Sequence, residues 1–300
     1  MRRALALAAL VGLLATAAAS APAANGLQQS AVAQATAPSV VAYRGLGAWV
    51  DIYDKGEWLH PLDVVHQLVS HHVRTLYLEV PFVPGTSTIQ HPAGVTAFVR
   101  LCHQSGLRIV GWYLPTFLDV HMAIARSLAI VHFRNGTVGF DSFAMDIESN
   151  AVANPAVRSA RVVSIGKSLR TAVGARYPLG AVIPAPEGMV LSPSYWPGFP
   201  FAGIAQSYDA FVVMGYYTYH GFGYYPARQY TRDNILLLQA ATGNPNEPIH
   251  VIGGLAAKSG AGQVQGFVSA LQDCGAVGGS LYDLATTGPS LWPPLAGVPH

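Results

Sequence analysis

The chain has 300 residues, of which 51% are hydrophobic and 11% are charged, and its formal net charge is +2. This low, balanced charge and the lack of any basic run exclude the usual electrostatic surface of a nucleic-acid-binding protein. The length and the hydrophobic content suit one large domain with a substantial core.

The N-terminus has the pattern of a secretory signal peptide. Two early arginines precede an apolar stretch over residues 4–18, and residues 19–21 are small, as at cleavage sites. We therefore predict a signal peptide over residues 1–21, a disordered lead-in over 22–40 and a secreted or extracytoplasmic protein. A membrane anchor is the alternative, but the stretch is short for a span of about 20 residues and Pro22 follows it. No later stretch is apolar enough to cross a membrane.

Short apolar stretches alternate with longer amphipathic stretches along the rest of the chain. The predicted strands cover residues 46–53, 75–80, 108–114, 142–147, 180–183, 210–217, 250–255 and 279–284. The predicted helices cover residues 61–72, 92–105, 120–132, 155–173, 232–242 and 262–273. Residues 193–208 contain three prolines and are predicted to form a loop with a short helix.

Eight strands that alternate with helices are typical of parallel βαβ units, which two architectures accommodate. A doubly wound open sheet would place a glycine-rich phosphate-binding loop after its first strand. Here the first strand runs into Asp51-Ile52-Tyr53-Asp54, which contains no glycine. The number of strands and the size therefore favour an α/β fold of the (β/α)8 TIM-barrel type, formed as one domain by residues 41–300.

The chain has two cysteines, Cys102 and Cys274. The predicted barrel places them on helices that are not neighbours, whereas a disulfide requires Cα atoms within about 7 Å. We therefore expect two separate thiols. No C-x-x-C pair and no paired histidines at ligand spacing occur, so the sequence predicts neither a metal site nor a cofactor.

The acidic residues gather at the ends of predicted strands. The chain has only fifteen Asp and Glu residues. Those at or just beyond the carboxyl ends of strands are Asp51, Glu79, Asp146, Glu148, Glu187 and Asp283. This end of a (β/α)8 barrel, here called the mouth, carries the active site in essentially every characterised enzyme of the fold. We therefore predict an acidic cleft at the mouth.

The fourth predicted strand carries two of these carboxylates. Because strand side chains alternate, Ala144, Asp146 and Glu148 face the barrel axis, and the residues between them face the helices. Two like charges in partly apolar surroundings raise the pKa of one of them. A carboxyl that stays protonated near neutral pH can act as a general acid. The alternative is a pair that an arginine or tyrosine holds for structure alone.

Residues 141–148 resemble the fourth-strand signature of the chitinases of glycoside hydrolase family 18, D-G-x-D-x-D-x-E. Asp141, Asp146 and Glu148 match its first, third and fourth acidic positions, and Ala144 stands at the second. The resemblance implies a TIM barrel that hydrolyses glycosidic bonds. It also implies that Glu148 protonates the glycosidic oxygen while Asp146 orients the N-acetyl group of the substrate, which attacks the sugar in place of an enzyme carboxylate.

The sixth strand is similar to a second segment of that family, M-x-Y-D. Met214 and Tyr216 match it, and Tyr217 replaces its Asp. The resemblance implies that Tyr216 binds the acetamide of the substrate. Near the end of the eighth strand, Tyr282 or Asp283 stands where the family usually has a tryptophan.

These observations predict a secreted glycoside hydrolase that acts on a polysaccharide or amino-sugar glycan, with Glu148 and Asp146 as catalytic residues. The expected substrate-binding residues are Asp51, Glu79, Glu187, Met214, Tyr216, Tyr217 and Asp283. Aromatic residues near the strand ends, above all in residues 216–225, suit the apolar faces of sugar rings.

Three alternatives stay open. Glu79 or Glu187 could pair with Glu148. A distance of about 5 Å between the two carboxyl groups would suit a retaining enzyme with its own nucleophile, and a longer distance would suit an inverting enzyme. Ala144 and Tyr217, which replace acidic residues, would also suit a non-catalytic, lectin-like carbohydrate-binding barrel at the cell surface. A cell-surface structural protein, finally, would have no ordered acidic pocket at its strand ends.

Overall fold

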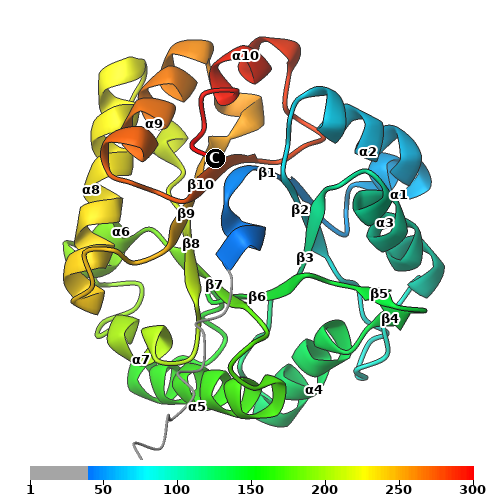
Figure 1. Cartoon of the computed structure of the whole chain (residues 1–300). Helices are drawn as coiled ribbons and strands as arrows, with labels where there is room; N and C mark the ends of the chain where they lie inside the picture. Colours follow the sequence, from blue (N-terminus) through cyan, green and yellow to red (C-terminus); the bar gives the residue numbers. More distant parts are fainter. Residues whose placement is uncertain (1–39) are drawn as a thin grey trace, which may run out of the picture. The chain divides into compact units, whose positions relative to one another are not determined.

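The computed structural model describes residues 40–300, which belong to one compact unit. Eight strands form a closed barrel in which every neighbouring pair is parallel (Figure 1). In ring order they are β1 (Gly45–Val50), β2 (Thr75–Glu79), β3 (Arg108–Tyr113), β6 (Ser142–Asp146), β7 (Leu179–Pro184), β8 (Ala210–Met214), β9 (Ile249–Leu255) and β10 (Gly278–Tyr282). The predicted (β/α)8 TIM barrel is confirmed.

Helices surround the barrel in Figure 1. They are α1 (Lys55–Leu59), α2 (Pro61–Ser70), α3 (Pro92–Gln104), α4 (Val120–Val131), α5 (Pro155–Val173), α6 (Pro186–Val190), α7 (Phe201–Ala205), α8 (Tyr224–Thr242), α9 (Ala261–Asp273) and α10 (Trp292–Leu295). Four 3₁₀ turns and a small hairpin complete the fold: η1 (Val40–Tyr43), η2 (Tyr217–Tyr219), η3 (Ala256–Lys258), η4 (Pro289–Leu291), β4 (Arg134–Asn135) and β5 (Val138–Gly139).

The starts of the helices follow from local sequence. Proline occupies the first turn of α2, α3 and α5, where the missing N–H costs nothing. The side chains of Asp119 and Asn154 accept hydrogen bonds from backbone N–H groups at the starts of α4 and α5. The helix predicted over 232–242 is longer than expected, because α8 begins at Tyr224.

The hydrophobic core has two layers. The outer layer lies between strands and helices, and Phe143, Met145 and Ile147 belong to it. The inner layer fills the barrel with large rings such as Trp49, Tyr77 and Trp112, so the barrel is a packed core. The alternation predicted for the fourth strand is therefore confirmed, since Ala144 belongs to the inner layer and its neighbours to the outer one.

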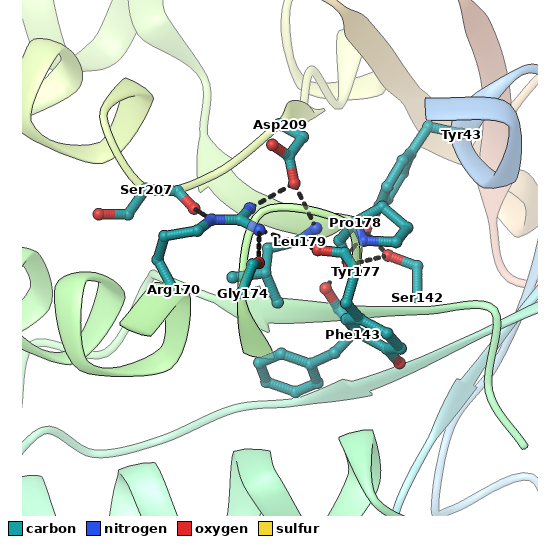
Figure 2. A network of polar contacts seen from close by, with 10 residues as sticks. All are labelled: Tyr43, Ser142, Phe143, Arg170, Gly174, Tyr177, Pro178, Leu179, Ser207 and Asp209. Atoms are coloured by element: carbon teal, nitrogen blue, oxygen red, sulfur yellow. Dashed lines mark hydrogen bonds and ion pairs between the residues drawn. The ribbon is translucent and has the colours of Figure 1, made fainter. Parts of the chain in front are cut away.

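The turn η1 closes the end of the barrel opposite the mouth, here called the floor. Tyr43 of this turn extends its hydroxyl to Ser142 Oγ at 2.5 Å, and Ser142 Oγ donates onward to the carbonyl of Pro178 over 2.8 Å (Figure 2). A Cβ on Gly180 would lie 2.4 Å from the Tyr43 hydroxyl oxygen. Glycine is therefore the residue that lets the ring of Tyr43 enter the floor of the barrel.

A second part of the network in Figure 2 ties α5 to the starts of two strands. Arg170 donates to the carbonyls of Ser207, Gly174 and Tyr177 at 2.9 to 3.0 Å, and its guanidinium pairs with Asp209. Oδ2 of Asp209 also accepts the backbone N–H of Leu179 over 2.8 Å. One guanidinium thus provides hydrogen bonds to several backbone groups just before β7 and β8 begin.

The C-terminal residue also lies at the floor, where Nδ1 of His300 is 3.9 Å from the position of a Cβ on Gly45. Cys102 and Cys274 are free thiols, as expected. Among residues 40–300, no helix combines the length and apolar character that crossing a membrane requires. The predicted signal peptide over 1–21 and the lead-in, except Val40 at its end, lie outside the described residues.

Candidate active site

Asp146 ends β6 inside the barrel and is almost fully buried, with 6% of its surface exposed. Its Oδ1 atom has no hydrogen-bond partner among residues 40–300. Burial raises the pKa of Asp146 well above its usual range, and the nearby carboxyls of Glu148 and Glu79 raise it further. The raised pKa favours the protonated form of the Asp146 carboxyl, which donates a hydrogen bond as well as accepting one.

Glu148 lies two residues further along, at the mouth, and is only partly buried. Burial raises the pKa of its carboxyl too. The hydroxyl of Tyr195 donates to the backbone carbonyl of Glu148, which fixes the main chain where β6 has ended. Glu148 thus combines access to solvent with a raised pKa, the two properties that a general acid needs.

Glu148 lines an open hollow of about 360 Å³ at the mouth. The other residues that carry rings or polar groups into this hollow include Tyr195, Met214, Tyr216, Tyr219 and His220. Tyr216 has a left-handed backbone with φ of 36°. Burial raises the pKa of Tyr216, and Asp146 and Glu148 add to this effect, so its phenol is a neutral hydrogen-bond donor near both carboxyls.

A second group of carboxyls lies at the mouth around the ends of β1, β2 and β10. Glu79 ends β2, and its Oε2 accepts the backbone N–H of Ile52 over 3.1 Å. Burial raises the pKa of Glu79 to about 7, and the carboxyls of Asp51 and Asp54 act in the same direction. Asp54 has a pKa raised to about 6, again mainly by burial. The sequence did not single out Asp54, although it stands only three residues after Asp51.

Asp51, Asp54 and Asp283 have carboxylate oxygens within 4.8 Å of one another, close enough to share a cation. The protein itself already engages each side chain. Asp51 accepts hydrogen bonds from the Tyr282 hydroxyl and a backbone N–H, Asp54 accepts the N–H of Asp51, and Asp283 accepts two hydrogen bonds from Thr286. Internal hydrogen bonds therefore account for the orientation of this cluster.

A larger groove of about 680 Å³ is lined by residues that follow β1 and β2. Its lining is mainly apolar, with Ile52, Trp58, Leu59 and Pro81, and its polar members are Lys55, Gln90 and His91. The Nε1–H of Trp58 donates to the carbonyl of Asp51 over 2.8 Å, which ties the groove to the mouth. An apolar lining with a few polar groups at the edge of the groove suits the faces of sugar rings.

Two residues of the expected site, and one further residue that matches the family signature, lie elsewhere. Tyr217 is a core residue behind the sheet, where its hydroxyl bonds Ser259 Oγ at 3.1 Å and its ring packs on Phe267. Glu187, on α6, lines a different hollow, which it shares with Asp233. Asp141, which matches the first signature position, lies at the floor and binds His103, Arg108 and the N–H of Ile109, so it stabilises the strand start.

Comparison with known proteins gives a fold but no close relative. The amino-acid sequence matches no protein-family model and no curated protein. The structure superposes on a family 18 chitinase from Cycas revoluta in complex with allosamidin, with a TM-score of 0.60 and 12% identity, over 84% of this chain and 98% of that one. The chain shares its fold with chitinases of glycoside hydrolase family 18.

Other solved barrels are equally similar. The spore cortex-lytic enzyme SleL of Bacillus cereus matches with a TM-score of 0.62 and 10% identity, over 85% of this chain and 74% of that one. An endo-1,4-beta-mannanase from Rhizomucor miehei matches with a TM-score of 0.62 and 9% identity, over 83% of this chain and 90% of that one. These similarities show a glycoside-hydrolase-like barrel.

Proposed function

We propose that the protein is a secreted glycoside hydrolase that cleaves a polysaccharide or amino-sugar glycan, with Glu148 as the general acid. The observation that carries this proposal is the pairing of Glu148, open to a hollow at the mouth, with the buried carboxyl of Asp146. The similarity to chitinase and mannanase barrels supports the reaction class. Secretion rests on the signal-peptide pattern and is tested by sequencing the N-terminus of the exported protein.

The reaction that the family resemblance implies fits these residues. The protonated carboxyl of Glu148 gives its proton to the glycosidic oxygen as the C1–O bond breaks. The acetamide oxygen of the same sugar forms a new bond to C1, while Asp146 and the Tyr216 hydroxyl hold the acetamide. Water then attacks C1, the bond between C1 and the acetamide oxygen breaks, and the attacking water gives a proton to the Glu148 carboxylate. Asp51, Glu79, Met214 and Asp283 would line the path of the glycan.

The test is hydrolysis of chromogenic and polymeric glycans by the wild type and by Glu148→Gln. The amide keeps the shape of the side chain but has no acidic proton, so we expect the rate to fall by about 100-fold or more. Asp63→Asn is the matched control, because this carboxylate is exposed on α2. Equal rates for the wild type and Glu148→Gln would remove Glu148 as the acid.

A second candidate function is carbohydrate binding without turnover. Ala144 favours it, because this position offers no carboxyl beneath Asp146 and the neighbouring residue on β3 is the apolar ring of Trp112. A glycan array combined with product analysis separates the two functions. Tight binding with no released sugar supports the lectin-like function, and cleavage excludes it.

A further inference from the structure

Asp146 has no carboxyl below it on its own strand. The residue two positions earlier, Ala144, is fully buried in the inner layer of the core. Across the β3–β6 pairing Ala144 lies opposite Trp112, whose buried Nε1–H has no partner among residues 40–300. Its own strand therefore places no carboxyl beneath Asp146, and any acidic partner for Asp146 must come from Glu148 above it or from another strand.

Glu79 is the carboxyl that another strand supplies. The β2–β3 pairing sets Glu79 opposite Trp112, which in turn lies opposite Ala144 on β6. Tyr77, two residues before Glu79, belongs to the inner layer, so strand alternation turns Glu79 toward the barrel axis as well. Around the closed barrel the line of register partners descends toward the floor, so Glu79 lies level with Asp146, with a single strand between them.

The groups around these carboxyls are mostly acids and phenols. Among residues 40–300, no Lys or Arg forms an ion pair with Glu79, Asp146 or Glu148. The remaining acids and phenols at this part of the mouth are Asp51, Asp54, Tyr195, Tyr216, Tyr282 and Asp283, and the basic side chains that line its hollows are Lys55, His91 and His220. With no cation paired to them, closely spaced buried carboxyls are hard to ionise all at once.

We propose that Glu79 is a positioning residue of the site, which supplies from β2 the carboxyl partner that Asp146 lacks beneath it on its own strand. In its anionic form Glu79 disfavours a second negative charge on Asp146. The Asp146–Glu148 pair therefore gives up its last proton at a higher pH than it would without Glu79, which helps Glu148 to act as an acid. This role rests on the proposed glycosidase function, but the electrostatic link between Glu79 and Asp146 exists whether or not a glycan is cleaved.

The electrostatic link is tested without any substrate. Carboxyl carbons of the full-length protein are titrated by ¹³C NMR in the wild type, Glu79→Gln and the control Asp63→Asn. We expect Glu79→Gln to lower the higher apparent pKa of the Asp146–Glu148 pair by about one unit, because a neutral amide replaces a negative charge. The control leaves it unchanged. An unchanged titration of the pair in a folded Glu79→Gln protein would overturn the proposal.

Asp54→Asn provides a second variant that does not depend on the folding of Glu79→Gln. The carboxyl of Asp54 raises the pKa of Glu79, whereas the carboxyls that raise the pKa of Asp146 are those of Glu148 and Glu79. Asp54→Asn should therefore lower the pKa of Glu79 and move that of Asp146 much less. Equal shifts at both residues would contradict the arrangement in which Glu79 is the link between them.

The consequence for activity is a shifted pH profile. Glu79→Gln should move the alkaline limb of the rate profile to lower pH by the same amount as the NMR shift, and Ala144→Asp in the Glu79→Gln protein should move it back. If the NMR titration of the Asp146–Glu148 pair shifts but the alkaline limb of the rate profile does not, the positioning role is overturned. If the wild type hydrolyses no glycan, the proposed function fails, and the titration alone decides whether Glu79 acts on Asp146.

Discussion

The hydroxyl of Tyr282 donates a 2.7 Å hydrogen bond to Oδ2 of Asp51, which joins the last strand of the barrel to the end of the first at the mouth. Asp51 is almost fully buried, and its other carboxylate oxygen accepts the N–H of Tyr53 over 2.6 Å. Burial raises the pKa of Tyr282, and Asp51 raises it further, so the phenol stays a donor. This hydrogen bond thus adds a side-chain link at the mouth to the backbone pairing of β1 with β10.

We expect Tyr282→Phe to reduce the free energy of unfolding by about 1.5 to 3 kcal/mol, because Oδ2 of a buried Asp51 loses its donor. Urea denaturation near neutral pH measures this change. Tyr225→Phe is the control, since the side chain of Tyr225 is 78% exposed. Equal stability of Tyr282→Phe and the wild type would mean that water replaces the phenol at no cost.

Gly180→Ala should destabilise the floor. The added methyl would lie 2.4 Å from the Tyr43 hydroxyl oxygen and within 2.7 Å of two ring carbons. Overpacking of this kind costs about 1 to 3 kcal/mol. Chemical denaturation measures it, with Gly262→Ala as the control, because a methyl there meets nothing within 4 Å. A Gly180→Ala protein as stable as the control would show that η1 shifts freely.

Arg170→Met should cost about 3 kcal/mol, because the apolar stem remains while Asp209 and three carbonyls lose their donor. The melting temperature and the urea midpoint both report this loss. Arg228→Met, which breaks an exposed pair with Asp273, should leave both unchanged. Similar melting temperatures for the two variants would contradict a structural role for the network at the floor.

His250 makes stability depend on pH. It is fully buried between Tyr43, Tyr77 and Ser280, and burial lowers its pKa to about 4. An unfolded histidine titrates near 6.5, so between these values the folded state binds fewer protons. The contribution of neutral His250 is therefore complete above about pH 6.5 and is lost as the pH falls toward 4, on the order of 3 kcal/mol in all.

The measurement is the free energy of unfolding at about pH 7 and at about pH 5. The loss between the two should be smaller in His250→Asn than in the wild type, because the asparagine does not titrate. The buried carboxyls change the free energy of unfolding in the opposite direction. Because both proteins contain these carboxyls, their effect cancels when the two pH dependences are compared. Identical pH dependences would show that folding does not lower the pKa of His250.

Strand periodicity predicted the centre of the site well. β6 is buried on both faces, so its side chains keep a strict alternation, and the inward placement of Ala144 and Asp146 followed from the sequence. The same rule of alternation does not hold for Tyr217. β8 ends at Met214, and the left-handed backbone of Tyr216 breaks the alternation, so Tyr217 turns into the outer core. A sequence match to M-x-Y-D carries no information about that dihedral angle.

Other features depend on contacts that no local pattern encodes. Tyr43 contacts Ser142, which lies 99 residues later in the sequence. No pattern at residues 40–43, where the predicted lead-in ends, predicted a turn that closes the floor. The first two turns of α8 lack a clear apolar periodicity, which is why the sequence predicts this helix only from residue 232. The link between Glu79 and Asp146 likewise emerges only when two strand registers are combined.

The position of His300 beside Gly45 has a practical consequence for work with insoluble substrates. A protein attached to a bead or an electrode through its last residue would present the mouth, and with it Glu148, away from the solid support. Polymers too large to enter a porous matrix would then reach the carboxyls directly. Attachment through the loops after the strands would instead place the same carboxyls against the surface.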